Sequence, residues 1–594
     1  MTTGHAGGTP GIPRQETDPR GEPPGGSWNA TTRYMCAGAH LDEGFARAVV
    51  EELRHEAHRA CAPSYGVDLR YVCLHAERAL EEIRRRDLGV MGSVAVAFLL
   101  APLTTVVYVY ALKLTAAGAG RRRALPGVRA AQRGPDGRER LEREHPLQKL
   151  MGALGIRLLA LFGISALTAG VPLPWFSPGT GGAFLVGAVF LVGGPWFFAW
   201  RQQESVWRAI SRELVPGAAP ARKADLPSDV DLPRSATGGD ANLIVYSGYQ
   251  PFVGAGAEVS SWSFAMRLRH KDHRPGEDRE PEPCPIDSGD LVEHLRERLT
   301  RLGTGAEPAD SVRGLEVSEK VFVHGEELLS ETVLGRHAYW SERALAGRVP
   351  RGRPADHLEP ERVAGTRGLI DGPVRHCLCA QVRSWDGDLV LSVFLQAAVN
   401  GATLYLQSNT LVLTPVREEY RQADNLTERQ EAGSGGRLAV DALSASTVSL
   451  SAPLTRAVDV LTESSRLEKR RKRQREVIEH NRRYDFGARR SLRQMAASGN
   501  YRSFFQHVDA SRTGKQIELQ VFAALLDLLA RHDLDTGELE ERRNTILNNG
   551  IIMTGGSMSG SVAAGQGATA LSGQASRPKT GASGGAAPGR QAAS

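Results

Sequence analysis

Two long apolar runs dominate the pattern of hydrophobic and polar positions. Leu158–Phe176 and Ala183–Trp200 are each close to the roughly 20 apolar residues that a helix needs to cross about 30 Å of hydrocarbon. Only the uncharged loop Ser177–Gly182 separates them. The pattern predicts a transmembrane hairpin over residues 154–200, with its short loop outside the cell.

A third apolar run, Leu88–Leu112, is flanked by basic residues on both sides and contains Pro102 near its middle. Basic flanks favour the cytoplasmic side of a membrane. We therefore expect a re-entrant segment with both chain ends in the cytoplasm, and three full spans are the alternative.

Helical periodicity marks the segments around these runs. Leu41, Phe45, Val49 and Leu53 recur at four-residue steps, which predicts a small helical module over residues 33–87. Similar spacing predicts helices within 426–497 and 498–547.

The strongest β pattern lies between these modules. The apolar runs Val374–Trp385, Leu389–Val399 and Thr403–Val416 are joined by Asp386-Gly387 and Asn400-Gly401. Such dipeptides supply the positive φ angles of tight hairpins. We expect an antiparallel meander with at least one helix packed on it.

The predicted fold class is a multi-domain membrane protein with α-helical membrane segments, a cytoplasmic α+β domain and small helical modules. The expected order is a disordered tail (1–32), a helical module (33–87), a membrane segment (88–112), a basic cytoplasmic loop (113–149), a transmembrane hairpin (154–200), a juxtamembrane helix and linker (201–240), the α+β domain (241–425), a linker and basic helix (426–497), a helical module (498–547) and a Gly-rich low-complexity tail (548–594).

The segments Arg33-Tyr-Met-Cys-Ala-Gly-Ala-His-Leu-Asp42 and Pro63-Ser-Tyr-Gly-Val-Asp68 carry a family resemblance. With the apolar runs, 242–256 and 546–570, they resemble a group of uncharacterised actinobacterial integral membrane proteins. The resemblance covers about half of the chain in patches. It implies a membrane location and carries no activity.

Composition narrows the function classes. The 65 glycines and 32 prolines exceed average usage, which predicts extensive linkers. The net charge of +6 is too small for a surface that coats nucleic acid. Six cysteines in a chain of this length fit a reducing cytosol. Several cysteines and histidines cluster in the first helical module, but without a CxxC pair we expect no metal site.

Basic residues concentrate in one predicted helix. Seven of the ten residues from 466 to 475 are basic: Arg466, Lys469, Arg470, Arg471, Lys472, Arg473 and Arg475. In a membrane-anchored protein this density favours attraction to anionic lipid. A solvated helix face without a ligand is favoured at least as strongly. Nucleic acid is the less favoured partner, because no aromatic residues are interleaved.

Candidate chemistry is sparse elsewhere. The glycines of 248–256 follow a predicted strand, but the loop lacks a nucleotide-binding fingerprint, so a tight structural loop is favoured and no cofactor is expected. Asp509–Gly514 begins like a calcium loop, yet Gln520 stands where a bidentate Glu is needed. No catalytic constellation is evident, and catalytic residues stay unassigned.

These observations predict a non-enzymatic, membrane-anchored binding or scaffold protein whose soluble domains face the cytoplasm and which has a protein partner. The alternative is a membrane-tethered enzyme with a pocket in 241–425, formed by His324, Glu326 and Glu327 with the glycine-rich loop. Self-association through 548–571, which has low charge and no proline, is a further possibility.

Overall fold

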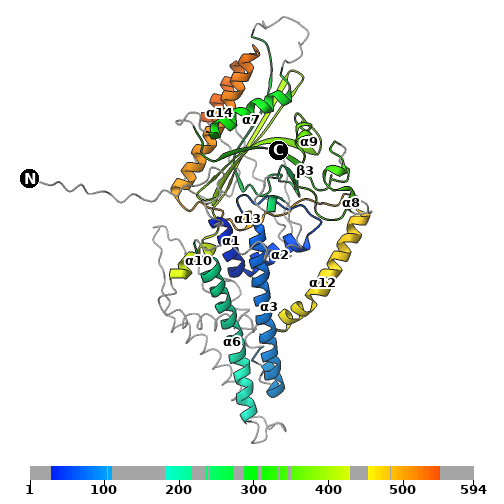
Figure 1. The fold of residues 1–594 in the computed structure, drawn as a ribbon, viewed down its shortest axis with the longest axis vertical. Helices are drawn as coiled ribbons and strands as arrows, with labels where there is room; N and C mark the ends of the chain where they lie inside the picture. The colour runs from blue at the N-terminus through cyan, green and yellow to red at the C-terminus, as the bar shows by residue number, and fades with distance from the viewer. Residues whose placement is uncertain are drawn as a thin grey trace, which may run out of the picture. The chain divides into compact units, whose positions relative to one another are not determined.

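The computed structural model traces the fold in Figure 1. It describes residues 29–102, 105–106, 108–109, 181–216, 234–236, 241–271, 286–304, 311–330, 333–345, 350–428, 453–481 and 483–548. Two compact units are present, Met1–Asp535 and Thr536–Ser594. The described part of the second unit is the helix α15 (Gly537–Asn548).

A six-stranded mixed sheet forms the centre of the first unit, with strand order β1-β3-β4-β5-β6-β2. Its strands are β1 (Leu243–Tyr246), β2 (Ala257–Arg267), β3 (Leu315–His324), β4 (Val374–Ser384), β5 (Leu389–Asn400) and β6 (Thr403–Leu413). β1 pairs with β3 in parallel, and every other neighbouring pair is antiparallel.

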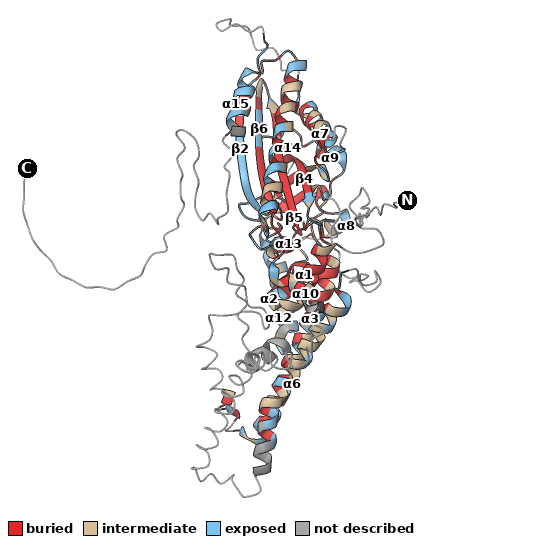
Figure 2. Cartoon of the chain, turned by 90° about the vertical axis from the view of Figure 1, so that its left-hand side faces the viewer, coloured by how far each residue is buried: buried red, intermediate tan, exposed pale blue. Residues whose placement is uncertain are grey.

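Strands β4, β5 and β6 form a meander whose turns follow the local sequence. The turn between β4 and β5 places Trp385, Asp386 and Gly387 at φ values of 54°, 56° and 78°. Gly401 has φ 58° in the turn between β5 and β6. Positive φ suits Asp386, Gly387 and Gly401, whereas a bulky residue such as Trp385 rarely adopts it and Asn400 does not. Figure 2 shows that burial is continuous along β4 and β5, whereas β2 is largely exposed.

Two helices, α7 (Ser288–Thr304) and α14 (Phe504–Arg531), cover one face of the sheet (Figures 1 and 2). α7 buries Leu291, Leu295, Leu299 and Leu302, which helical spacing places on one stripe. α14 also packs against the edge strand β2, where the ring of Phe522 stacks on Trp262 with centroids 5.1 Å apart.

The opposite face is closed by aromatic packing from the glycine-rich loop. The ring of Phe252 stacks on Phe394 at a centroid distance of 4.7 Å and meets Phe322 edge-on at 5.4 Å. Cys377 and Cys379 are buried in the same cluster. The loop is therefore part of the core.

The N-terminal helices share a core with segments far along the chain. These helices are α1 (Ala30–Leu41), α2 (Glu43–Val50), the π-helical turn η1 (Glu51–His55) and the first half of α3 (Leu69–Leu100). They pack against the end of α6 (Gly181–Glu213), against α10 (Glu418–Glu428) and against the short α13 (Leu492–Met495). This shared core supplies apolar area that the module alone would lack.

The remaining described helices flank these parts. They are η3 (Arg234–Ala236), η4 (Arg336–Ala338), α8 (Glu342–Leu345), α9 (Pro360–Ala364) and the long basic helix α12 (Pro453–His480). η4 and α9 contribute buried residues to the core around β1 and β3.

The expected membrane architecture is wrong for the described residues. Across them, no helix combines the length and the apolar character that a membrane crossing requires. The apolar end of α3 follows a charged first part, and α6 includes Pro195 and several glycines. These two helices pack together, with Val90, Ala97 and Leu191 in their shared core. The expected span 158–176 lies outside the described residues. The fold class is corrected to a mixed sheet with helices.

Residues 484–488 cover the outer edge of β1. Ala488 donates its N–H to the Val245 carbonyl at 2.9 Å, and its own carbonyl accepts from Ser247 at 3.1 Å. Gly487 lies so close to β1 that a Cβ at this position would overlap the carbonyl group of Tyr246. Close backbone approach therefore requires glycine here.

We predict that Gly487→Ala lowers the free energy of unfolding by about 1–3 kcal/mol, the usual cost of forcing a methyl group into a packed site. Gly92→Ala is the control, because a Cβ at this exposed position in α3 meets no atom within 4 Å. The control should be neutral or stabilising by up to about 1 kcal/mol through helix propensity. Urea denaturation followed by circular dichroism measures both, and equal stabilities of the two variants would contradict the prediction.

Candidate functional site

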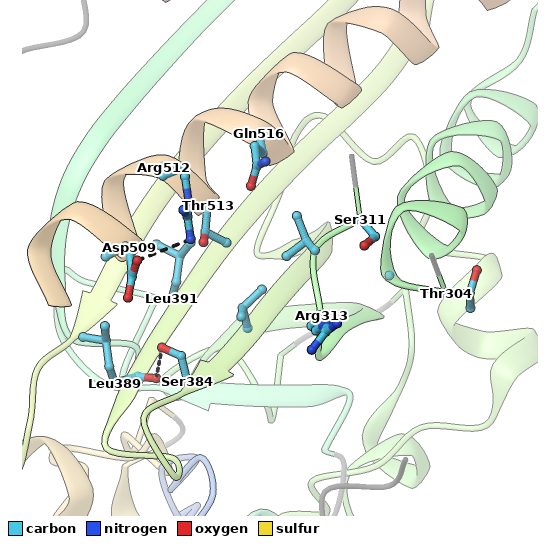
Figure 3. Close-up of a pocket in the computed structure, with 14 residues that line it drawn as sticks. Thr304, Ser311, Arg313, Ser384, Leu389, Leu391, Asp509, Arg512, Thr513 and Gln516 are labelled. Carbon is cyan, nitrogen blue, oxygen red and sulfur yellow. Dashed lines mark hydrogen bonds and ion pairs between the residues drawn. The ribbon is translucent and has the colours of Figure 1, made fainter. Parts of the chain in front are cut away.

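The first candidate site is a cleft of about 610 Å³ between α7, α14 and the turn end of β4 and β5 (Figure 3). Its floor is apolar and consists of Val382, Leu389 and Leu391, all of which are buried. Hydroxyl and amide groups line its walls: Thr304, Ser311, Ser384, Thr513 and Gln516. The volume is in the range of ordinary ligand sites.

One face of α14 supplies most of the polar wall. Asp509, Arg512, Thr513 and Gln516 follow the i, i+3, i+4, i+7 spacing that aligns side chains on a helix. Ser503 fixes the start of this helix through a capping box with Gln506. The register of the polar face is thus set at the first turn.

Two arginines give the cleft its charge. Arg512 forms an ion pair with Asp509 at 3.3 Å, and both side chains are solvent-accessible. Arg313, which precedes β3, is exposed and lines the opposite wall, and its side chain has no acceptor among the described residues. The cleft therefore carries two guanidinium groups and one carboxylate, and its lining includes no histidine or cysteine.

A second, shallower hollow of about 530 Å³ lies at the carboxyl ends of the parallel strands β1 and β3. Tyr246 and His324, the last residues of these strands, meet ring to ring at 5.2 Å. Glu327 and Arg375 also line it. Burial raises the pKa of Tyr246, and Arg375 opposes that shift.

Local contacts occupy polar groups of three residues of this hollow, His324, Glu327 and Arg375. The Glu326 N–H donates to Nδ1 of His324 at 3.3 Å, and Glu327 accepts a hydrogen bond from Ser330 at 2.7 Å. Arg375 donates to the Gly372 carbonyl at 2.6 Å. His324 and Glu327 do line one hollow, as the enzyme hypothesis expected, but Glu326 and the loop 248–256 are not in its lining.

The basic cluster lies on α12, where its residues are exposed. Arg470 turns toward the N-terminal module and pairs with Glu51 at 2.8 Å and with Glu56 at 3.0 Å. Arg466, Lys469, Arg471, Lys472, Arg473 and Arg475 remain on the exposed surface of the helix. Lipid binding by this cluster stays a prediction, whereas Arg470 also has a structural role that spacing did not indicate.

The Cys/His residues of the N-terminal module do not converge on one point. Within the described ranges, no three His, Cys, Asp or Glu side chains form a group that could hold a metal ion. His40 and His75 instead contact each other directly, with Nε2 of His40 3.0 Å from Nδ1 of His75. Burial, assisted by Arg78, lowers the pKa of His40 to about 4. Burial is the main cause that lowers the pKa of His75 to about 3, and His40 and Arg78 lower it further.

Sequence patterns missed a charged network beneath α7. Glu319 on β3 accepts hydrogen bonds from His376 at 2.8 Å and from Arg367 at 2.6 Å. Burial alone would raise the pKa of Glu319, but these two partners outweigh it and lower the pKa to about 2. Arg367 also reaches Glu293 of α7 at 3.6 Å. The network joins strand, loop and helix, and no local motif links its members.

Residues 261–559 match the family model of an AbeC-like domain. No curated protein and no solved structure matches the chain. The match begins inside β2 and includes α7, the meander and α14, and therefore the whole lining of the α7–α14 cleft. It says nothing of actinobacterial membrane proteins, so that resemblance stays a prediction.

The buried histidine pair predicts a specific acid sensitivity. Below pH 6.5 the unfolded chain protonates both histidines, while the folded chain keeps them neutral down to about pH 4 and 3. Stability is therefore fully present above pH 6.5 and is lost as the pH falls through this window, by up to about 1.4 kcal/mol per pH unit for each histidine.

Between pH 4.5 and 6.5 the slope of the unfolding free energy against pH reflects the number of protons taken up on unfolding. We expect His75→Gln to lower this number by about one, because glutamine does not titrate, and so to make the slope shallower. Exposed His480 provides the matched control, and His480→Gln should retain the wild-type slope. Urea denaturation at several pH values measures the slopes. Identical slopes for the two variants would exclude the buried pair as the source.

Proposed function

The chain belongs to the AbeC-like family, and we propose that it is a non-enzymatic binding protein. Its α7–α14 cleft would hold an acidic peptide segment of a protein partner. The family description names a domain and no reaction. The observation that carries this proposal is the pair of arginines over an apolar floor. Arg313 and Arg512 face a cleft of about 610 Å³ whose base is Val382, Leu389 and Leu391.

Each part of the cleft suits one part of an extended peptide. Guanidinium groups bind carboxylates with paired, charge-assisted hydrogen bonds. Hydroxyl and amide groups, such as those of Thr513 and Gln516, pair with peptide backbone, and the buried floor accepts an apolar side chain. Arg313 supports the proposal most, because it has no acceptor within the described chain.

Two features favour a carboxylate peptide over a phosphate ligand. α7 ends at Thr304, beside the cleft, and the carboxyl end of a helix carries partial negative charge. Asp509 adds a full negative charge next to Arg512. Both repel a dianionic phosphate more strongly than a singly charged carboxylate, and a peptide can in addition offer its N–H donors to them.

An enzyme acting through the second hollow is the alternative. The location of Tyr246 and His324 at the carboxyl ends of parallel strands supports it, since open sheets often bind ligands there. It is less favoured because His324, Glu327 and Arg375 each use a polar group in a bond to a neighbouring residue. In addition, no hydrogen bond between a base and a nucleophile is found among the described lining residues.

Peptides selected from a random library on the full chain should be enriched in Asp and Glu. We expect Arg313→Glu and Arg512→Glu each to weaken the selected peptides by about 10-fold or more, since a hydrogen bond to a charged group contributes about 1.5–3 kcal/mol. Fluorescence anisotropy with labelled peptide measures the affinities.

Lys515→Glu supplies a matched control, because this exposed residue is on the same helix and outside the cleft. It makes the same charge change and should alter affinity less than about 3-fold through long-range electrostatics. Equal losses in all three variants, or selection of peptides without acidic enrichment, would refute a specific site at the cleft.

A further inference from the structure

The two edges of the sheet differ in how they are covered. The outer edge of β1 pairs with the backbone around Ala488. The outer edge of β2 has no such partner: among the described residues, β6 is the only strand bonded to it. Backbone contacts with another segment begin only beyond the end of β2, where the Arg269 carbonyl accepts from Asp535 at 2.8 Å and the Lys271 N–H donates to Asp533 at 3.1 Å.

An uncovered edge strand of this length presents a row of unpaired N–H and C=O groups to any other strand. β2 has eleven residues, most of them exposed, and its only charged residues are Glu258 and Arg267 at its two ends. It contains no lysine or proline, the residues that commonly protect such edges. Figure 2 shows this exposed strand at the margin of the sheet.

A β-bulge places the two charges on the same face. Glu258 pairs with Leu411 and Ser260 pairs with Thr410, so Val259 is the extra residue. Glu258 therefore takes the position that residue 259 would hold in a regular strand. Its carboxylate approaches the amide of Asn409 at 3.5 Å, and Asn409 also pairs with Ser261. Alternation from Ser261 then puts Arg267 on this same face.

The strand is self-complementary as a result. Counting four positions from Ser263 in one direction reaches Arg267, and counting four in the other reaches the position held by Glu258. An antiparallel partner of the same sequence would set Glu258 opposite Arg267 at both ends. Opposite charges in directly opposed positions stabilise a strand pair, and like charges destabilise it.

We propose that β2 is a dimerisation edge, which pairs antiparallel with β2 of a second copy about a two-fold axis at Ser263. This axis is perpendicular to the sheet. Pairing of the two β2 strands makes one continuous sheet from the sheets of the two copies. Within one chain, Trp262 and Phe264 both stack against Phe522 of α14. In the proposed dimer, Trp262 would lie opposite Phe264 of the second copy and form an aromatic cross-strand pair on this face. Ser261 lies opposite Ala265, and these small side chains leave the other face free of clashes.

The axis position gives a direct test by disulfide formation. Residues directly opposite in an antiparallel pair have Cα atoms about 4.5–5.5 Å apart, within the range a disulfide spans. Ser263→Cys should therefore form a covalent dimer under mild oxidation. Ser261→Cys is the matched control on the same face, because the axis separates the two copies of residue 261 by four residues, or about 13 Å. Cys284 is replaced by serine in both variants.

The charged ends give an independent test. Glu258→Arg and Arg267→Glu should each weaken dimerisation of the full chain by about 10-fold or more, because each places like charges opposite at both ends of the ribbon. An equimolar mixture of the two variants restores opposite charges and should form heterodimers. Analytical ultracentrifugation measures association, and circular dichroism confirms that each variant is folded.

Crosslinking of Ser263→Cys well above Ser261→Cys, together with recovery in the mixture, supports the β2 edge. A wild-type chain that stays monomeric up to about 100 µM overturns the proposal. Crosslinking of both cysteine variants to the same extent, or dimers that ignore the charge changes, also overturns it, because association would then use another surface.

Discussion

The structure depends on how the outer edge of β1 is covered. This strand has only four residues, and backbone from distant parts of the chain completes its surroundings. The Phe486 N–H donates to the Gly325 carbonyl at 3.1 Å, and the Phe486 carbonyl accepts from Ala60 at 2.7 Å. One ladder of hydrogen bonds thus links the sheet, the segment after α12 and the N-terminal module. Unpaired buried backbone groups are costly, so these three parts stabilise one another.

A buried charge cluster also links distant parts of the chain, at the end of the sheet where β4 turns into β5. Arg493 of α13 is fully buried and donates to the carbonyls of Asp388 and Thr414, at 2.8 and 3.1 Å. The Asp388 carboxylate pairs with Arg421 of α10. Burial lowers the pKa of Arg493 to about 10, partly opposed by Asp388. Removing one partner of such a cluster typically costs about 3–5 kcal/mol. Because Asp388 adjoins Leu389, the cluster also fixes one end of the α7–α14 cleft.

Local sequence could predict the elements that local chemistry determines. Asp386-Gly387 and Asn400-Gly401 indicate the meander, and the leucine spacing of α7 indicates its buried stripe. The candidate site is harder to predict from sequence, because Arg313 and Arg512 are far apart in the chain and line one cleft only after folding. The sequence shows Asp509–Gly514 as the start of a calcium-loop pattern that fails at Gln520, and it does not show that α14 aligns Asp509, Arg512 and Gln516 along one wall of a cleft. For the described residues the membrane prediction is wrong, because the apolar runs are only parts of longer helices: α3 begins with a charged part and α6 ends with one, and neither is apolar over the length that a crossing requires.

The contrast between the two sheet edges connects the proposed functions. Within the part of the chain that the structure describes, β1 is covered and the sheet can extend only through β2. A two-fold axis perpendicular to the sheet keeps the faces of both copies aligned, so both α14 helices, which stack on Trp262 through Phe522, lie on the same side. The two clefts beside α14 then open on that side too. A partner with two acidic segments would bind both copies at once, and the second contact would benefit from a high effective concentration. Pairing at β2 thus converts a single cleft with modest affinity into a bivalent surface.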